Sequence, residues 1–249
     1  MRTYAIGDIH GHLTLLQALH ARIAADQDAH RDDETRQGPA PIVHVGDLVD
    51  RGPDSRGVVE YLRAGIAGGA NWVVLKGNHD RMFGGFIEDI AHHDPGLRTD
   101  LSWLHPRLGG AATLASYGVR NAAERPVAPV HLEARALVPP EHCAFIAGLP
   151  SIYQRGEVAF VHAGIRPGVA LAEQTETDLL WIRAGFLEDT RDHGPLIVHG
   201  HTALDRPTHY GNRLNIDSGA AYGGPLSAVV IEGRAVFHLT AEGRVPLLP

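Results

Sequence analysis

Five short segments that place glycine beside aspartate, asparagine or histidine constrain this chain of 249 residues more than any other feature. Each segment follows a short apolar run that predicts a β-strand, so all five are expected at strand ends. In an open α/β sheet such ends converge on one crevice, and ligands bind there. The five segments are residues 7–11, 46–52, 77–80, 162–164 and 200–202.

Short apolar runs alternate with helical patterns in the first half of the chain. The predicted strands are residues 4–6, 42–45 and 72–75, and the predicted helices are 13–25, 55–67, 82–90 and 141–147. Ser55 is a candidate N-cap, and residues 121–140 are expected to be irregular. Two hairpins are expected at 152–161 and 227–240. These patterns predict an α/β fold with mixed sheets and one domain over residues 1–249.

Charge and cysteine content limit the partners and the compartment. Lys and Arg number 22 against 29 Asp and Glu, a net charge of -7, so binding to nucleic acid or to a membrane surface is not expected. Cys143 is the only cysteine, so no intrachain disulfide can form, and a cytoplasmic location is expected. The chain has no apolar stretch of the roughly 20 residues that span a bilayer.

The residue types in the five segments suit metal ions. The chain has 17 histidines, and Asp and His together favour divalent transition metals, to which an Asn carbonyl adds a neutral oxygen ligand. Asp8 and His10, two residues apart on an extended stretch, can hold one ion, and the carboxylate of Asp47 can bridge a pair. Two divalent ions carry more positive charge than the carboxylates of Asp8 and Asp47 can neutralise, so such a site attracts phosphate. The Walker A loop and the G-x-S-x-G elbow are absent.

In order, the motifs GDIHG, GDLVDRG, GNHD, HAG and GHT resemble those of the metal-dependent serine/threonine phosphoprotein phosphatases. The chain is most similar to compact bacterial and phage members, within the calcineurin-like metallophosphoesterase superfamily. Residues 178–183 and 215–219 also resemble that group, and the likeness covers residues 4–231. It implies a four-layer αββα sandwich with a dinuclear metal centre at the strand ends.

The resemblance also implies which residues hold the metals. The last ligand is expected in the Gly-His-Thr unit, which favours His201, with His199 as the alternative. Asn78 is expected to touch the substrate as well as a metal. The ions are expected to be Mn²⁺, with Fe or Zn as alternatives. The implied ligands are Asp8, His10 and Asp47 for one ion, and Asp47, Asn78, His162 and His201 for the other.

The same resemblance implies the catalytic and phosphate-binding residues. Arg51 would grip phosphate oxygens with its planar guanidinium, which a lysine could not imitate. Asp50 would hydrogen-bond His79 and raise its proton affinity, so that His79 acts as the general acid. Arg183 is the implied second phosphate clamp, and Arg166 is the alternative.

The expected reaction is direct hydrolysis, in which a hydroxide that bridges the two metals attacks phosphorus. The substrate is expected to be a phosphoprotein or a phosphorylated small molecule. Phosphoserine and phosphothreonine are the favoured groups, and phosphotyrosine is a further candidate. The alternative is symmetrical hydrolysis of diadenosine tetraphosphate. An RNA-end phosphatase is disfavoured by the net charge of -7, and a non-enzymatic metal module by the many carboxylates.

Residues 81–125 are expected to form a rim over the site. Trp103 and Tyr117 in this rim could stack on adenine, or they could pack in the core. The two interpretations separate a nucleotide hydrolase from a protein phosphatase.

Overall fold

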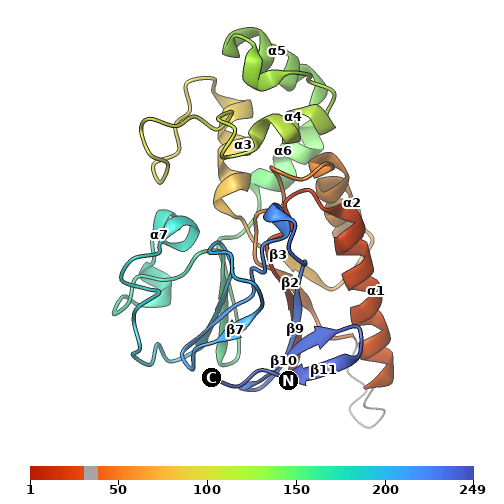
Figure 1. The fold of residues 1–249 in the computed structure, drawn as a ribbon, viewed down its shortest axis with the longest axis vertical. Coiled ribbons are helices and arrows are strands. Elements are labelled where there is room, and N and C mark those ends of the chain that lie inside the picture. Colours follow the sequence, from red (N-terminus) through yellow and green to blue (C-terminus); the bar gives the residue numbers. More distant parts are fainter. Residues whose placement is uncertain (31–38) are drawn as a thin grey trace.

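Two mixed β-sheets form the centre of the protein in the computed structural model, which describes residues 1–30 and 39–249 (Figure 1). The six-stranded sheet has the order β11-β10-β9-β1-β2-β3, and the five-stranded sheet has the order β4-β5-β6-β8-β7. The first sheet contains β1 (Arg2–Ile6), β2 (Ile42–His44), β3 (Trp72–Val74), β9 (Ala228–Glu232), β10 (Ala235–Thr240) and β11 (Gly243–Pro246). The second contains β4 (Ile152–Arg155), β5 (Val158–Val161), β6 (Leu196–His199), β7 (Thr208–His209) and β8 (Arg213–Asn215).

The two sheets pack through an apolar core. Val43 and Leu75 from the first sheet are wholly buried against Phe160, Val198 and Leu214 from the second. β1, β2 and β3 run parallel, and so do β5, β6 and β8. The five polar segments begin at the carboxyl ends of strands in these two parallel sets, so the packing of the sheets decides how the segments meet.

Helices cover the outer faces of both sheets, which completes the predicted αββα layers (Figure 1). Leu16 and Leu62 of the first two helices pack with Tyr4 and Ile6 of β1, whereas Leu179 packs on the second sheet. Within the described residues, no helix has both the length and the apolar character to cross a membrane. The helices are α1 (Leu13–Ala29), α2 (Ser55–Ala67), α3 (Asn78–Glu88), α4 (Gly110–Ser116), α5 (Val127–Leu137), α6 (Pro140–Ala147) and α7 (Glu176–Trp181). Short 3-10 helices are η1 (Ala122–Glu124), η2 (Leu171–Glu173) and η3 (Ala220–Tyr222).

Three predicted elements need correction. The N-cap of α2 is Asp54, which accepts the N–H of Gly57 at 2.8 Å, whereas Ser55 accepts the N–H of Asp50. The helix expected from residue 82 begins four residues earlier, at Asn78. α5 lies within the segment 121–140, which is expected to be irregular. Its internal proline falls in the first turn, where proline costs no helical hydrogen bond.

A pair of buried histidines links α1 to β2. His44 Nδ1 donates to the carbonyl of Val73 at 3.1 Å, so its Nε2 can accept from His20 Nε2, 2.9 Å away. His20 Nδ1 then accepts the hydroxyl of Tyr61 at 2.9 Å. Burial lowers the pKa of His20 to about 4 and the pKa of His44 to about 3, so both rings are neutral at neutral pH.

Because both buried rings are neutral, we expect the folded protein to lose stability in acid. The unfolded rings titrate near the ordinary pKa of 6.5, so below that pH the unfolded state binds protons that the folded state rejects. We expect the free energy of unfolding of the metal-free protein to fall as the pH drops from 6.5 towards 4, by up to about 1.4 kcal/mol per pH unit for each ring. Urea denaturation at a series of pH values measures this dependence. A His20→Leu/His44→Leu variant should show a shallower dependence, and an unchanged one would contradict the assignment.

Candidate metal centre

The five polar segments meet at one end of the two sheets. Three follow β1, β2 and β3 of the first sheet, and two follow β5 and β6 of the second. Two hydrogen bonds join the sheets there: His162 Nδ1 donates to the carbonyl of Val45 at 2.9 Å, and the N–H of His201 donates to Asp8 Oδ2 at 3.0 Å. The side chains predicted to bind metals are therefore drawn from both sheets.

Asp47 lies between two groups of candidate ligands. Its Oδ2 is 3.3 Å from His10 Nε2, and its Oδ1 is 3.4 Å from His162 Nε2. Ligand atoms of His10, Asp47 and His79 lie within 4.8 Å of one another, and so do those of Asp47, His162 and His201. Each carboxylate oxygen of Asp47 thus faces its own group, which is the arrangement that a bridging ligand needs.

The tautomers of two histidines leave lone pairs directed at the site. His10 Nδ1 donates to the carbonyl of Val49 at 2.8 Å, and His162 uses its Nδ1 in the same way, so Nε2 of each ring is an acceptor. Asn78 Oδ1 is 2.9 Å from His162 Nε2 and 2.9 Å from His201 Nδ1. Two acceptors, Asn78 Oδ1 and His162 Nε2, face each other with no proton between them. This donor set fits a cation.

Asp8 adds a carboxylate oxygen without a partner, although it belongs to neither group of atoms within 4.8 Å. Its Oδ1 is buried without a hydrogen bond. Burial, followed by the charges of Asp217 and Asp47, raises the pKa of Asp8 well above its ordinary value. A buried carboxylate of this kind is stabilised by a cation. A Cβ at Gly200 would clash with Asp8 Oδ1, so the glycine of the Gly-His-Thr motif allows this close approach.

Of the two histidines left open by the sequence, His201 lies in a candidate ligand group. His199 is fully buried, and its Nε2 is 3.3 Å from Arg213 Nη1. Its Nδ1 is 3.1 Å from the carbonyl of Gly200. His199 is thus a side chain of the sheet interior.

The N-terminus of α3 is attached to the loop that follows β2. Asp80 is buried and accepts the N–H groups of Gly77 at 2.8 Å and Leu48 at 2.9 Å. The N–H of His79 donates to Asp47 Oδ1 at 3.0 Å. These bonds turn the first residues of α3 towards Asp47, so the helix start presents its polar side chains to the site.

Left-handed backbone conformations gather at the site. A positive φ costs a non-glycine residue on the order of 1 kcal/mol or more, and such strain is concentrated at functional sites. In the described part of the chain, the one non-glycine residue with positive φ outside the site is Asn121. The others, with φ between 45° and 74°, are His10, Asp47, Asp50, Arg51 and His201.

The expected contact between Asp50 and His79 is present, with Asp50 Oδ2 2.6 Å from His79 Nδ1. Asp50 is fully buried and also accepts Trp103 Nε1–H at 2.8 Å and Thr113 Oγ1–H at 2.6 Å. Burial lowers the pKa of His79 below its ordinary value. The bond to Asp50 acts in the predicted direction, because it raises that pKa together with the charge of Asp47, but burial has the larger effect.

Trp103 and Tyr117 are core residues. They are 6% and 3% exposed, and both pack against Phe83. Tyr117 also hydrogen-bonds His142 Nδ1 at 2.9 Å. The interpretation that they pack is confirmed, and the interpretation that they stack on adenine is wrong.

Arg51 lies beside the candidate ligands. Its Nη1 is 2.7 Å from His10 Nε2, and its guanidinium carbon is 5.2 Å from the ring centre of Tyr222. Tyr222 is 71% exposed, so most of its ring faces solvent. Sequence reasoning missed Tyr222, because its exposure next to Arg51 depends on the tertiary fold.

Arg183 also reaches the site, whereas Arg166 is held elsewhere. Arg183 Nη2 is 3.5 Å from the carbonyl of His201. Burial lowers the pKa of Arg183, and the charge of Asp47 acts in the opposite direction. Arg166 is exposed and forms a two-bond pair with Asp178, at 2.7 and 2.9 Å.

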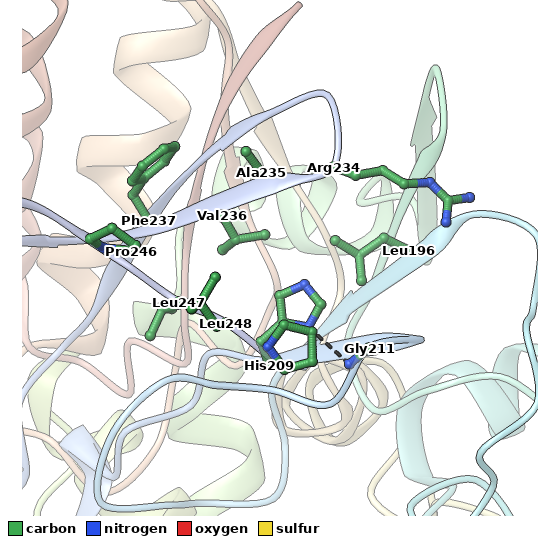
Figure 2. Close-up of a pocket in the computed structure, with 11 residues that line it drawn as sticks. Leu196, His209, Gly211, Arg234, Ala235, Val236, Phe237, Pro246, Leu247 and Leu248 are labelled. Atoms are coloured by element: carbon green, nitrogen blue, oxygen red, sulfur yellow. Dashed lines mark hydrogen bonds between the residues drawn. The ribbon is translucent and has the colours of Figure 1, made fainter.

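A pocket of about 320 Å³ lies at the other end of the second sheet (Figure 2). It is lined by Leu196, the first residue of β6, whereas the ligand segment with His201 follows the last residue of that strand. Val236 and Phe237 of β10 and His209 of β7 also line it. All of the predicted site residues belong to the described chain, and none of them lines this pocket. The pocket is therefore separate from the candidate metal centre.

Comparisons with known proteins agree with the geometry of the centre. A family model described as calcineurin-like phosphoesterase matches residues 1–225. The asymmetrical bis(5'-nucleosyl)-tetraphosphatase PrpE of Geobacillus thermodenitrificans is 26% identical, over 90% of this chain and 88% of that protein. Serine/threonine-protein phosphatase 1 of Salmonella typhimurium is also 26% identical, over 92% and 91%.

Among solved structures, the cold-active protein-tyrosine phosphatase of a Shewanella species has a similar fold, with a TM-score of 0.62 and 17% identity. The alignment covers 99% of this chain and 80% of that one. Because the family model spans most of the chain and the motifs meet at one site, this protein belongs to the calcineurin-like phosphoesterase family and is a metal-dependent phosphoester hydrolase.

Proposed function

We propose that this protein is a serine/threonine phosphatase that hydrolyses phosphoserine and phosphothreonine. The contact between Asp50 and His79 carries the proposal, since His79 Nδ1 is held at 2.6 Å and the ring lies in a candidate ligand group. A serine or threonine alkoxide is a poor leaving group that needs a proton in the transition state, whereas a polyphosphate leaves without one. A positioned acid therefore supports a monoester with an alkoxide leaving group.

The proposed roles follow the geometry of the site. When bound, two divalent ions, Mn²⁺ by expectation, would supply a hydroxide at neutral pH and neutralise phosphoryl charge. His79 donates a proton to the leaving oxygen, and Asp50 orients its ring. Arg51 and Arg183, rather than Arg166, grip the phosphoryl oxygens. The proposed ligands are Asp8, His10 and Asp47 for one ion, and Asp47, Asn78, His162 and His201 for the other.

We also propose that residues 1–249 act as one domain, because both sheets contribute ligand candidates. A cytoplasmic location stays a prediction that rests on the single cysteine.

Hydrolysis of a dinucleoside polyphosphate is the second candidate, and Tyr222 favours it. An exposed aromatic ring beside a phosphate-gripping arginine offers a surface on which a nucleobase can stack. The curated relative from Geobacillus thermodenitrificans is named an asymmetrical tetraphosphatase, whereas the alternative stated from the sequence is symmetrical cleavage. The products would distinguish the two.

A comparison of two substrates tests the proposal. With Mn²⁺, kcat/KM is measured for a phosphothreonine peptide and for diadenosine tetraphosphate, and the peptide is expected to be the better substrate. An advantage of about a hundredfold for the dinucleotide, roughly 2.7 kcal/mol, would overturn the phosphatase proposal in favour of the second candidate.

Tyr222→Ala adds a second arm to this test. If the ring stacks on a nucleobase, its loss is expected to lower kcat/KM for the dinucleotide about tenfold or more, with a change of less than about twofold for the peptide. Tyr210→Ala is the matched control, because Tyr210 is 45% exposed and also lies over an arginine, Arg213. A loss with both substrates, or an equal loss in the control, would contradict the stacking role.

A further inference from the structure

α7 contacts both segments of the second sheet that carry candidate metal ligands, residues 162–164 and 200–202. The N–H of Ala163, next to His162, donates to the carbonyl of Leu179 at 2.7 Å. The ring of Trp181, at the end of α7, meets the ring of His201 edge to face, with 5.8 Å between centres. Arg183 follows two residues later and reaches the carbonyl of His201. The position of α7 therefore determines where Arg183 lies.

A buried ion pair holds α7 from the side of α3. Arg81 on α3 donates to both carboxylate oxygens of Asp94, at 2.6 and 2.7 Å, and the Asp94 side chain is fully buried. Arg81 Nη1 then lies 3.4 Å from Thr177 Oγ1 and 3.5 Å from Glu176 Oε2, both in the first turn of α7. Because the guanidinium is planar and makes two parallel bonds to Asp94, the direction of its remaining N–H groups is fixed.

The turn after Asp94 supports the other end of α7. Asp94 Oδ1 accepts the N–H of Gly96 at 2.9 Å, which closes a tight turn. The Gly96 backbone lies directly against the indole of Trp181, so close that a Cβ at this position would clash with the ring. The pair of Arg81 and Asp94 thus contacts the start of α7 directly and its end through this turn.

We propose that Arg81 and Asp94 are positioning residues for phosphate binding, which act by holding α7 so that Arg183 faces the phosphoryl group. The inference rests on the proposed function, in which Arg183 is the second phosphate clamp. The two side chains bond to each other, and Arg81 also bonds to α7, so in this proposal their effect on the substrate passes through Arg183. Loss of the two-bond geometry should weaken substrate binding and leave kcat largely unchanged.

The test uses Arg81→Lys, which keeps the charge but cannot make the two parallel bonds. We expect KM for p-nitrophenyl phosphate and the inhibition constant for inorganic phosphate to rise about tenfold, with kcat within about twofold, because small displacements of a positioning group are costly. A merely destabilised variant would lose active protein, which lowers the apparent kcat rather than raising KM. Calorimetric titration with Mn²⁺ should show unchanged metal stoichiometry.

A double-mutant cycle with Arg183→Ala separates this inference from the function that it rests on. Arg183→Ala alone should raise KM, and Arg81→Lys should add less than about twofold in that background. An equal rise in both backgrounds, or no rise from Arg81→Lys while Arg183→Ala has its effect, would overturn the positioning role alone. No effect of Arg183→Ala would overturn the clamp and this inference together. Arg98→Lys is the control, because Arg98 pairs with Asp100 in the same segment but is exposed.

Discussion

Replacing Asp47 with asparagine is expected to abolish turnover and to remove both metal ions. Asp47 is the one side chain common to the two groups of candidate ligands found among the described residues, and each of its oxygens faces a different group. An amide offers a single neutral oxygen, so it cannot bridge two cations or balance their charge. We expect kcat/KM to fall by about a thousandfold or more, since both the nucleophile and the charge stabilisation depend on the ions.

Metal analysis and calorimetric titration with Mn²⁺ measure the loss of the ions, and initial rates measure the loss of turnover. Asp100→Asn is the control, because the carboxylate of Asp100 is exposed and lies outside both ligand groups. If the Asp47→Asn variant still bound two ions with near-normal affinity, Asp47 could not be the bridging ligand.

Replacing His79 with asparagine is expected to leave both ions bound and to lower the rate on a phosphothreonine peptide by about 10²- to 10⁴-fold. The loss should shrink greatly with p-nitrophenyl phosphate, because p-nitrophenolate leaves without a proton. The measured quantity is the ratio of the rate losses on the two substrates. A general acid gives a much larger loss on the peptide, whereas a residue that only supports the structure of the site gives similar losses on both.

Asp50→Asn is the matched variant, since Asp50 bonds to the ring of His79 and lies in neither candidate ligand group. It should show the same dependence on the leaving group, with a smaller loss on the peptide. His79 also lies in a candidate ligand group. Loss of one ion from His79→Asn, measured by metal analysis, would therefore contradict the acid assignment and make His79 a ligand.

The parts of the fold that the sequence predicts well are those with a strong local pattern. The buried strand β5 is a continuous apolar run, and β2 is apolar at its first two residues. The glycine-flanked polar segments that follow them mark where each strand ends. Sequence reasoning misses α5 because prolines stand at or near both of its ends. Proline locally favours irregular structure, whereas the helix is stabilised by the tertiary packing of its buried face.

The supporting contacts of the site could not be predicted, because they join residues far apart in the chain. Trp103 and Thr113 reach Asp50 across 53 and 63 positions, and neither lies in a recognisable motif. The net shift in the pKa of His79 has a related cause. The carboxylate partner that raises this pKa is visible in the sequence, whereas the burial that outweighs it is a property of the whole fold.

The proposed ligands are divided between two parts of the chain, with four before residue 80 and two after residue 160, and each part belongs to a different sheet. Neither part can build the complete centre by itself. The ions would cross-link the two sheets, so metal binding would also stabilise the packing of one sheet on the other. Metal supply would then control how long the folded molecule survives as well as how fast it works.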